Sequence, residues 1–317
     1  MQTLSRMFMK NRLLALLLLC APAAFALPMA TSARSLVPSE IQQIISVDYR
    51  ALKDSPTAQA LKAQVLPNNL KEFEAALKGI GIDAERDLDQ LTFASFRSGK
   101  QGLQVISVAQ GSFSAKTVLK KMKLKKISGT KYGTALIYPM ADGLVMTFLD
   151  EYTLAFGTLA SLQSGLDARD GKRPTLDSNA QMADQMAAVD SAPVWSILDQ
   201  QGSQAMMRSA MGDASKVADY ETLKKRILAS RYTMNFQSGV NLDLTVLTAD
   251  SMTAATLSTV VKGVMLYKKM NASPIEKTAI DSTTVDSDSS NLLVHFKTDD
   301  QKFQSLLHSE LFAAVSR

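Results

Sequence analysis

Cysteine, histidine and tryptophan are almost missing from this sequence of 317 residues, which holds one Cys, two His and one Trp. A single cysteine rules out a fold held together by internal disulfides. The scarcity of Cys and His also argues against the zinc and copper sites that use these ligands. No phosphate-binding glycine loop and no G-x-S-x-G hydrolase motif occurs in the chain. We therefore expect no catalytic set, no metal site and no cofactor.

The first 26 residues differ from the rest of the chain. A basic start without acidic residues (1–12) precedes an apolar run at 13–19, and small residues follow at 24 and 26. This is the pattern of a secretory signal peptide. The apolar stretch is shorter than the ~20 residues that a membrane-spanning helix needs. We predict cleavage after Ala26, a periplasmic or secreted protein, and no integral membrane span afterwards. An uncleaved anchor is the alternative.

Loss of this leader would change both the cysteine content and the charge. Cys20 lies within it and follows Leu19 rather than a small residue, which argues against lipidation. The mature chain would then carry no thiol. Three of the 35 basic residues also lie in the leader, so the net charge would fall from +5 to +2. This near balance argues against nucleic acid as a general partner.

Strand and helix signals alternate along the remaining chain. Strands are expected at 41–49, 91–96, 103–109, 125–128, 134–138, 144–149, 153–156, 194–198, 231–237, 241–248 and 291–297, and at Val285. Helices are expected at 54–65, 70–79, 112–122, 159–166, 200–227 (with a break at 212–213), 251–270 and 299–315. Ser-Gly turns predict two hairpins, one around 98–102 and one around 238–239. Ser251 is the expected N-cap of the long helix.

The order of these elements occurs twice. FASFRSGKQGLQVISV from Phe93 and YTMNFQSGVNLDLTVL from Tyr232 both read as strand, Ser-Gly turn and strand, and a Ser-led helix follows each. Groups of strands between helices predict an α+β fold rather than regular βαβ alternation. We expect two similar halves, 41–179 and 180–317, each an antiparallel sheet packed against helices. Residues 27–40 read as a flexible lead-in, and the polar segment 167–179 as the boundary between the halves.

Lysines form the main local charge feature. They are Lys116, Lys120, Lys121, Lys123, Lys125, Lys126 and Lys131. Lys116, Lys120 and Lys123 share one helical face by their spacing. The first six are candidates for contact with an anionic surface, such as lipid headgroups or a cell-wall polymer. A solvated face without a partner is the alternative.

The sequence is also rich in methionine, with 16 residues. Met182 and Met186 are four residues apart, as are Met207 and Met211, and Met206 lies beside the second pair. Helix packing in the core is the first interpretation of this pattern. These five residues are also candidates for an apolar-ligand surface, and copper binding is a weaker alternative because neither His nor Cys accompanies them.

Other titratable residues give no catalytic pattern. His295 falls in an expected strand and His308 in the last helix, and neither lies near a nucleophile motif. Asp83, Glu85, Asp87 and Asp89 alternate ahead of a strand but lack the central glycine of a calcium loop. We interpret this acidic segment as a solvated helix start. Asp281, Asp286 and Asp288 receive the same interpretation.

Four segments carry a resemblance. They are Val47–Leu52 (VDYRAL), Gly81–Leu88 (GIDAERDL), Gln110–Phe113 (QGSF) and Phe148–Gly157 (FLDEYTLAFG). The chain is similar in these segments to uncharacterised exported bacterial proteins with repeated α+β domains of unknown function. The resemblance implies a fold and an exported location, and it transfers no catalytic residue.

Export without a recognisable catalytic set favours a non-enzymatic binding or scaffold protein. Its partner would be a lipid, a peptide or another component of the cell envelope, and the sequence leaves the oligomeric state open. The alternative is an exported hydrolase with a carboxylate-based site. A deep pocket with two carboxylates about 5–10 Å apart would favour the hydrolase.

Overall fold

The computed structural model describes residues 28–65, 68–99, 102–211 and 220–307. The expected leader, Cys20 and His308 lie outside these residues. The strands are β1 (Ile41–Asp48), β2 (Leu88–Arg97), β3 (Leu103–Gly111), β4 (Thr130–Tyr132), β5 (Ala135–Pro139), β6 (Val145–Phe148), β7 (Thr153–Gly157), β8 (Val194–Leu198), β9 (Ile227–Asn235), β10 (Val240–Thr248), β11 (Thr283–Asp288) and β12 (Asn291–Thr298). The helices are α2 (Thr31–Leu36), α3 (Tyr49–Lys53), α4 (Pro56–Val65), α5 (Asn68–Ile80), α6 (Ala84–Asp87), α7 (Ala115–Leu124), α8 (Leu159–Arg169), α9 (Ala180–Ala187), α10 (Gln200–Met211), α11 (Tyr220–Lys224), α12 (Ser251–Asn271), α13 (Pro274–Asp281) and α14 (Asp300–Leu307).

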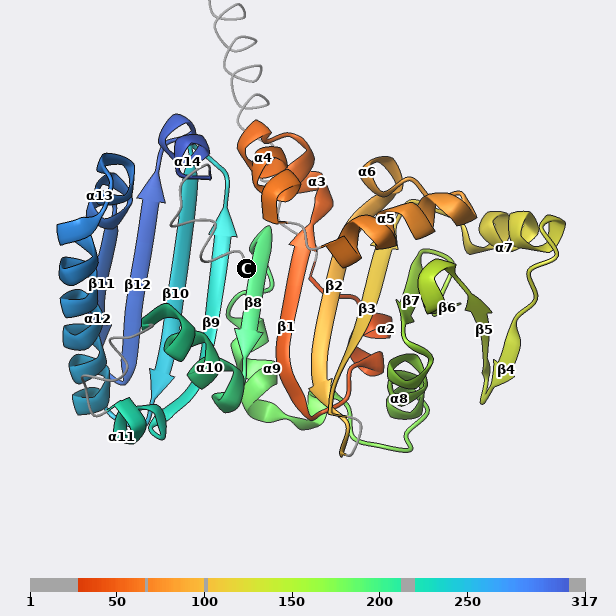
Figure 1. Ribbon diagram of the computed structural model, residues 1–317. Coiled ribbons are helices and arrows are strands. Elements are labelled where there is room, and N and C mark those ends of the chain that lie inside the picture. The colour runs from red at the N-terminus through yellow and green to blue at the C-terminus, as the bar shows by residue number, and fades with distance from the viewer. Residues whose placement is uncertain (1–27, 66–67, 100–101, 212–219, 308–317) are drawn as a thin grey trace, which may run out of the picture.

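These strands form one twelve-stranded sheet, in the order β11-β12-β10-β9-β8-β1-β2-β3-β7-β6-β5-β4 (Figure 1). Neighbouring strands are antiparallel, and both predicted hairpins are present as β2–β3 and β9–β10. Ser238 and Gly239 have φ of 58° and 99°, which suits a tight hairpin turn. The α+β class is therefore confirmed.

The two predicted halves are joined through a single pair of strands. β1 and β8 pair at the centre, so the strands of 41–179 and 180–317 join into one continuous sheet rather than two. On one side β1 leads through α3–α6 to the β2–β3 hairpin, then α7, then the four strands β4–β7. On the other side β8 leads through α10 and α11 to the β9–β10 hairpin, then α12 and α13, then β11 and β12. The internal repeat and the similarity of the two halves stay predictions.

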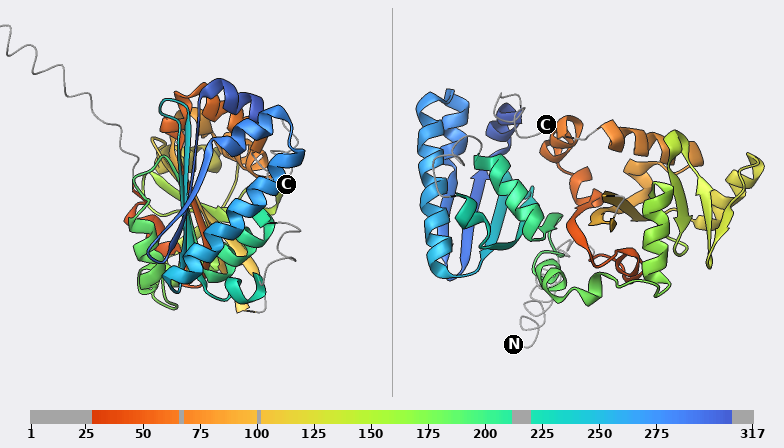
Figure 2. Two further views of the ribbon diagram at one scale, coloured as in Figure 1. Left: turned by 90° about the vertical axis from the view of Figure 1, so that its left-hand side faces the viewer. Right: turned by 60° about the horizontal axis from the view of Figure 1, so that its bottom comes forward.

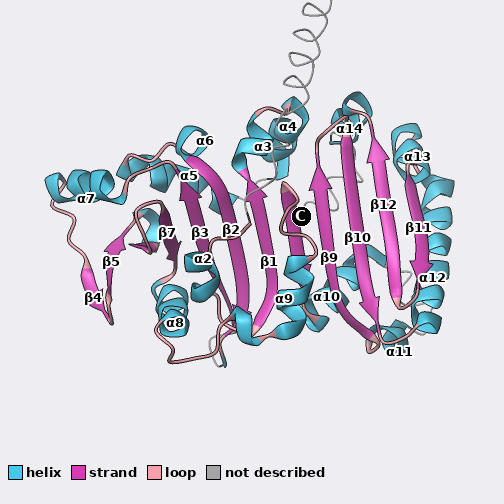
Figure 3. Ribbon diagram, turned by 180° about the vertical axis from the view of Figure 1, so that it is seen from behind, coloured by secondary structure: helices cyan, strands magenta, loops and turns pink. Residues whose placement is uncertain are grey.

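Helices cover one face of the sheet along its length and the other face only in part. Ile44 of β1 pairs with Ile197 of β8, and both point into a core closed by α2, α8 and α9. The opposite face packs against α5 and α7 at one end and against α10 and α12 at the other. On the face that carries α2, α8 and α9, Figure 3 shows no helix of the described residues over β10, β12 and β11, and Figure 2 shows helices on both sides of the sheet.

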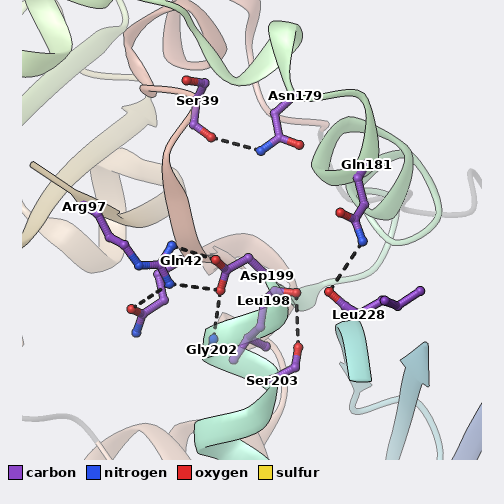
Figure 4. A network of polar contacts seen from close by, with 10 residues as sticks. All are labelled: Ser39, Gln42, Arg97, Asn179, Gln181, Leu198, Asp199, Gly202, Ser203 and Leu228. Atoms are coloured by element: carbon purple, nitrogen blue, oxygen red, sulfur yellow. Dashed lines mark hydrogen bonds and ion pairs between the residues drawn. The ribbon is translucent and has the colours of Figure 1, made fainter. Parts of the chain in front are cut away.

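A polar network ties β2 to the β8–α10 connection across the central strand pair (Figure 4). The Arg97 guanidinium donates to both carboxylate oxygens of Asp199, from Nη1 at 2.6 Å and from Nη2 at 3.3 Å. Its Nη2 also donates to Gln42 Oε1 at 3.1 Å. Asp199 accepts in addition from the backbone N–H of Gly202 at 2.8 Å, at the start of α10. This partly buried pair links the end of β2 to the residue that follows β8.

We expect Arg97→Gln to lower the free energy of unfolding by about 1–2 kcal/mol, because it leaves the shielded Asp199 carboxylate without its cation. Urea denaturation measures the change. Arg86→Gln is the matched control: Arg86 also pairs with an aspartate, Asp87, but its side chain is 71% exposed, so we expect at most a small loss. Equal losses in the two variants would contradict the structural role of the Arg97 pair.

Three local predictions differ from the structure. The expected lead-in 27–40 contains α2, whose Ala33 and Leu36 are fully buried, so this segment belongs to the core instead of being flexible. The expected strand 125–128 is wrong, because these residues end α7 and begin a turn. The N-cap of α12 is Asp250 rather than Ser251, since the Asp250 carboxylate accepts from the N–H of Thr253 at 2.8 Å.

Candidate functional site

Helix α7 lies at one end of the molecule (Figure 1). Four of the predicted lysines lie on this helix, and Lys125 and Lys126 directly follow it. Ser114 caps the helix by accepting from the N–H of Thr117 at 3.3 Å, and its hydroxyl donates to Glu151 at 2.5 Å. Val118 and Met122 are buried against the core under α5. Because one side of this short helix is buried, its lysines occupy the remaining side.

All six predicted lysines, Lys116, Lys120, Lys121, Lys123, Lys125 and Lys126, are exposed, as is Lys131 on β4. Within the described parts of the chain, none of them lies within 4.0 Å of a carboxylate as an ion pair. Like charges three or four residues apart on a helix destabilise it by a few tenths of a kcal/mol per pair. Helix α7 therefore carries a local electrostatic cost that no ion pair among the described residues offsets.

Two of these lysines have a role inside the fold. Lys125 donates from Nζ to the carbonyl oxygen of Gly79 at 2.8 Å, in the last turn of α5. The Lys121 ammonium lies so close to Gly81 that a Cβ there would be 2.8 Å from Nζ. The carbonyl end of a helix is electronegative and favours cations. Lys121 and Lys125 thus stabilise the end of α5, whereas Lys116, Lys120, Lys123 and Lys126 make no such contact.

The ends of α5 and α7 are built alike but carry different residues. In α7 the N–H of Ile127 donates to Met122 and that of Lys126 to Lys123, both at 3.0 Å. In α5 the N–H of Ile82 and that of Gly81 make the equivalent bonds at 3.0 Å. Both ends are Schellman motifs, which need a residue with positive φ. Gly81 fills that position in α5 with φ 90°, and Lys126 fills it in α7 with φ 59°.

We expect Lys126→Gly to raise the free energy of unfolding by about 0.5–1 kcal/mol, because glycine adopts a positive φ without the steric cost that a side chain incurs. Thermal or urea denaturation measures the gain. Lys120→Gly, in the middle of the same helix, should instead lower stability by a similar amount. A loss in both variants would show that the Lys126 side chain stabilises the fold.

A shallow hollow of about 230 Å³ lies between these two helix ends. It is lined by Lys78, Gly79, Ile80, Gly81, Lys121, Met122, Leu124, Lys125 and Ile127. Leu124 stands 78% exposed beside it, in the middle of the lysine run, and Leu136 on β5 is also exposed. The site thus combines an apolar floor with a cationic rim, and outward-facing lysines surround it. We name this region, α7 with the end of α5 and the β4–β5 hairpin, the α7 tip.

The sequence could not identify the α5 side of this site. Lys78, Gly79 and Ile80 lie far before the lysine run in the sequence (Gly79 is 46 positions from Lys125), and only the packing of α5 on α7 brings them together. Leu124 carried a local signal, since an apolar side chain lies between Lys123 and Lys125 at the end of an otherwise charged helix face.

Four of the five methionines predicted for an apolar-ligand surface are buried in the core. Met182 and Met186 are buried in the core under α9, and Met207 and Met211 are buried in the core under α12. Met206 is half-buried and packs against the second of these cores. The surface interpretation is therefore wrong for the four buried residues, and the packing interpretation applies: their spacing of four residues gives each helix an apolar inner face.

The remaining titratable residues show no convergent arrangement. His295 lies on β12, with Nδ1 2.6 Å from Asp243 Oδ1 on β10, on the part of the sheet that no helix covers. Asp83 caps α6, and Asp87 accepts two hydrogen bonds from Arg86, which hold the pKa of Asp87 below its usual range. No group of three His, Cys, Asp or Glu side chains able to hold a metal occurs in the portion of the chain that the structure describes.

Neither of two hollows on the described surface is lined by a carboxylate. The first, about 310 Å³ in volume, lies between α13, β12 and α14 and is lined by Ile275, Thr278, Ala279, Phe296, Thr298, Gln301, Lys302, Ser305 and Leu306. The second is the hollow of the α7 tip. None of the helices described is both long enough and apolar enough to span a membrane.

Comparison with known proteins adds little to this picture. No protein-family model matches the sequence, and no curated protein matches it. Among solved structures, crystal form I of TP0453 matches with a TM-score of 0.47 and 8% identity, covering 90% of this chain and 97% of that one. Crystal form III matches with a TM-score of 0.45 and 7% identity, over 86% and 96% of the two chains. TM-scores below 0.5 carry no argument about this chain.

Proposed function

We propose that the chain is an exported, non-enzymatic binding protein whose α7 tip attaches to an anionic lipid surface of the cell envelope. One observation carries this proposal. Lys116, Lys120, Lys123 and Lys126 are exposed, lie close together and have no acidic partner in the described chain. Export rests on the leader pattern at residues 1–26.

The energetics of the tip favour a partner of opposite charge. Four lysines on ten residues of helix repel one another, and bound anions would turn that repulsion into attraction. A lysine close to an anionic membrane surface contributes about 1 kcal/mol. Leu124 adds an apolar side chain that can enter the headgroup region beside the cations. Lysines that only served solubility would more often be interspersed with acidic residues.

The alternative of a carboxylate-based hydrolase has no support from the two hollows. A glycosidase-type site needs two carboxylates facing one cleft. The hollow of the α7 tip is bordered by lysines, and the one between α13 and α14 by Lys302 and by hydroxyl, amide and apolar side chains. These two hollows therefore offer no carboxylate pair for hydrolysis.

Co-sedimentation with lipid vesicles tests the proposal. Protein expressed from the full coding sequence should bind vesicles of phosphatidylglycerol and phosphatidylcholine, but not vesicles of phosphatidylcholine alone. Binding should weaken as ionic strength rises from ~0.01 M to ~1 M, because the Debye length falls from about 30 Å to about 3 Å. Equal binding to both vesicle types, or no binding to either at low salt, would refute the lipid-binding proposal.

N-terminal sequencing tests the predicted cleavage of the leader. The sequence of the exported protein should begin at Leu27, and an intact Met1 would refute cleavage.

A further inference from the structure

Helix α12 lies at the end of the sheet opposite the α7 tip (Figures 1 and 2). It exposes an apolar face. Met252, Leu266, Tyr267 and Met270 are 79%, 67%, 68% and 77% exposed. Their spacing places them on one side of the helix, together with Ala255, Thr256, Thr259 and Gly263. We call these eight residues the α12 face. It carries no charged residue, and Lys262 lies at its margin.

The rest of α12 is anchored in its own fold. Ala254 and Leu257 are buried over β11 and β12. Lys268 donates from Nζ to the carbonyl oxygen of Ala210 at 3.3 Å, and Lys269 pairs with Asp281. Two of the three lysines of the helix are therefore engaged within the chain, unlike those of the α7 tip.

The side chains in the middle of the α12 face are small, and its threonine hydroxyls already donate hydrogen bonds within the helix. The hydroxyl of Thr256 donates to the carbonyl oxygen of Met252 at 2.8 Å, and that of Thr259 to Ala255 at 3.0 Å. A surface that covered these threonines would leave no hydroxyl donor without a hydrogen-bond acceptor, so burying them would cost little free energy. Gly263 has no neighbouring atom within 4 Å of the position a Cβ would take, so the backbone there is open to close approach.

We propose that the α12 face binds the same face of a second copy of this chain, with the two helices antiparallel. A two-fold axis near Thr259 would place Met252 of one copy beside Tyr267 of the other, and Thr256 beside Gly263. Large side chains would then meet at both ends while small ones allow the helix axes to approach at the centre. A self-complementary patch of this kind is what a two-fold homodimer requires.

The exposed area agrees with such a pair. The four large side chains expose roughly 500–600 Å², at the upper end of apolar patches on monomeric proteins. Two copies together would bury about 1,100 Å² or somewhat more, near the lower limit of specific protein interfaces. We therefore expect a reversible dimer rather than an obligate one.

A bilayer surface fits the α12 face less well than a second copy. Helices that lie in a membrane interface carry bulky apolar side chains along their length and free cations on their flanks. The centre of the α12 face is small, and Lys268 and Lys269 already have partners in the chain. The lipid contact proposed for the α7 tip is thus independent of α12.

Sedimentation velocity of the full-length protein over a range of concentrations tests the dimer. The wild type should show a concentration-dependent dimer, and L266K/M270K should raise its dissociation constant at least tenfold. Both side chains are exposed, so urea denaturation of this variant should match that of the wild type. A wild type that stays monomeric at every concentration would overturn the proposal, and so would a variant that dimerises unchanged.

A cysteine cross-link locates the interface. In a Cys20→Ser background the chain has no other thiol, so Thr259→Cys near the axis should form a disulfide-linked dimer under mild oxidation. Thr284→Cys, equally a threonine replacement but on the exposed edge strand β11, is the control and should stay monomeric. Equal cross-linking of the two variants would overturn the antiparallel pairing. Loss of binding to phosphatidylcholine vesicles by L266K/M270K, with a monomeric wild type, would identify a bilayer as the occupant instead.

Discussion

A Gly111→Ala variant should lose about 3 kcal/mol of the free energy of unfolding, or fail to accumulate as folded protein. Gly111 ends β3, where the chain passes against the α6–β2 connection. A Cβ at this position would lie far inside the contact distance of the Asp87 carbonyl oxygen and 2.9 Å from Leu88 Cα. Both atoms belong to the backbone, so no side chain can rotate away, and the strands themselves would have to separate.

The shift would also reach the candidate site. The N–H of Ser112 donates to Asp87 at 2.9 Å, and Ser114, three residues after Gly111, caps α7. Displacement of this segment would therefore move the start of the lysine-bearing helix. Urea denaturation measures the stability, and the vesicle assay at a temperature where the variant is folded measures the effect on binding.

Gly79→Ala is the matched control for Gly111→Ala. No atom lies within 4 Å of the position its Cβ would take, and it lies in the last turn of α5, so alanine should raise stability by up to about 1 kcal/mol. A loss of stability in Gly111→Ala together with a gain in Gly79→Ala would show that glycine is required at 111 because neighbouring backbone atoms lie so close to it. A Gly111→Ala variant as stable as the wild type would mean that β3 and the α6–β2 connection are further apart than the structure places them.

Neutralising the four unpartnered lysines should weaken binding to anionic vesicles by roughly 100- to 1,000-fold, since each contributes about 1 kcal/mol near such a surface. The variant is K116Q/K120Q/K123Q/K126Q, and co-sedimentation at low ionic strength gives the partition constant. Its stability should not fall, because removal of like charges relieves repulsion along α7. The remaining binding should depend less on salt than that of the wild type.

A control variant that replaces four other lysines distinguishes the effect of the lysines at the α7 tip from the effect of the net charge of the protein. Lys53, Lys225, Lys277 and Lys297 are exposed and lie on other elements, so K53Q/K225Q/K277Q/K297Q has the same net charge as the first variant. It should bind anionic vesicles within a few-fold of the wild type. Equal losses in the two variants would show that overall charge, rather than the α7 tip, brings the protein to the lipid.

Lys121 and Lys125 are left in place in the first variant for a structural reason. Both contact the end of α5, so their replacement would confound lost binding with a weakened helix end. The sequence alone could not make this distinction, because all of these lysines fall in one run and Lys121 and Lys125 have no local mark. Only the packing of α5 against α7 separates the structural lysines from the free ones.

Local patterns were sufficient where hydrogen bonding is local. The Ser-Gly turns predicted both hairpins, and strand and helix periodicity together predicted the α+β class. The spacing of Lys116, Lys120 and Lys123 also predicted a shared helix face, and these residues are exposed on α7 as expected. In each case the interacting groups lie within a few residues of one another, so the order of residue types is enough to specify them.

Helix ends were harder to predict from the same patterns. The Lys125–Ser128 segment alternates like a strand, but Lys126 takes a positive φ and Ile127 packs back on Met122 to complete the Schellman motif. A lysine is a poor signal for a position that usually holds glycine. The N-cap of α12 is Asp250, one residue before the predicted Ser251, because the Asp250 carboxylate accepts a hydrogen bond from the N–H of Thr253.

The sequence by itself thus determined the secondary structure class, the two hairpins and the one-sided lysine helix, because these depend on contacts between near neighbours. The tertiary structure decided which residues meet across long stretches of chain. In the tertiary structure β1 pairs with β8 in one sheet, and Met182 and Met207 are buried. Helix α2 packs into the core, and the α12 face is exposed. Those outcomes depend on which apolar faces find each other during folding, and residue order along one element does not specify its partner.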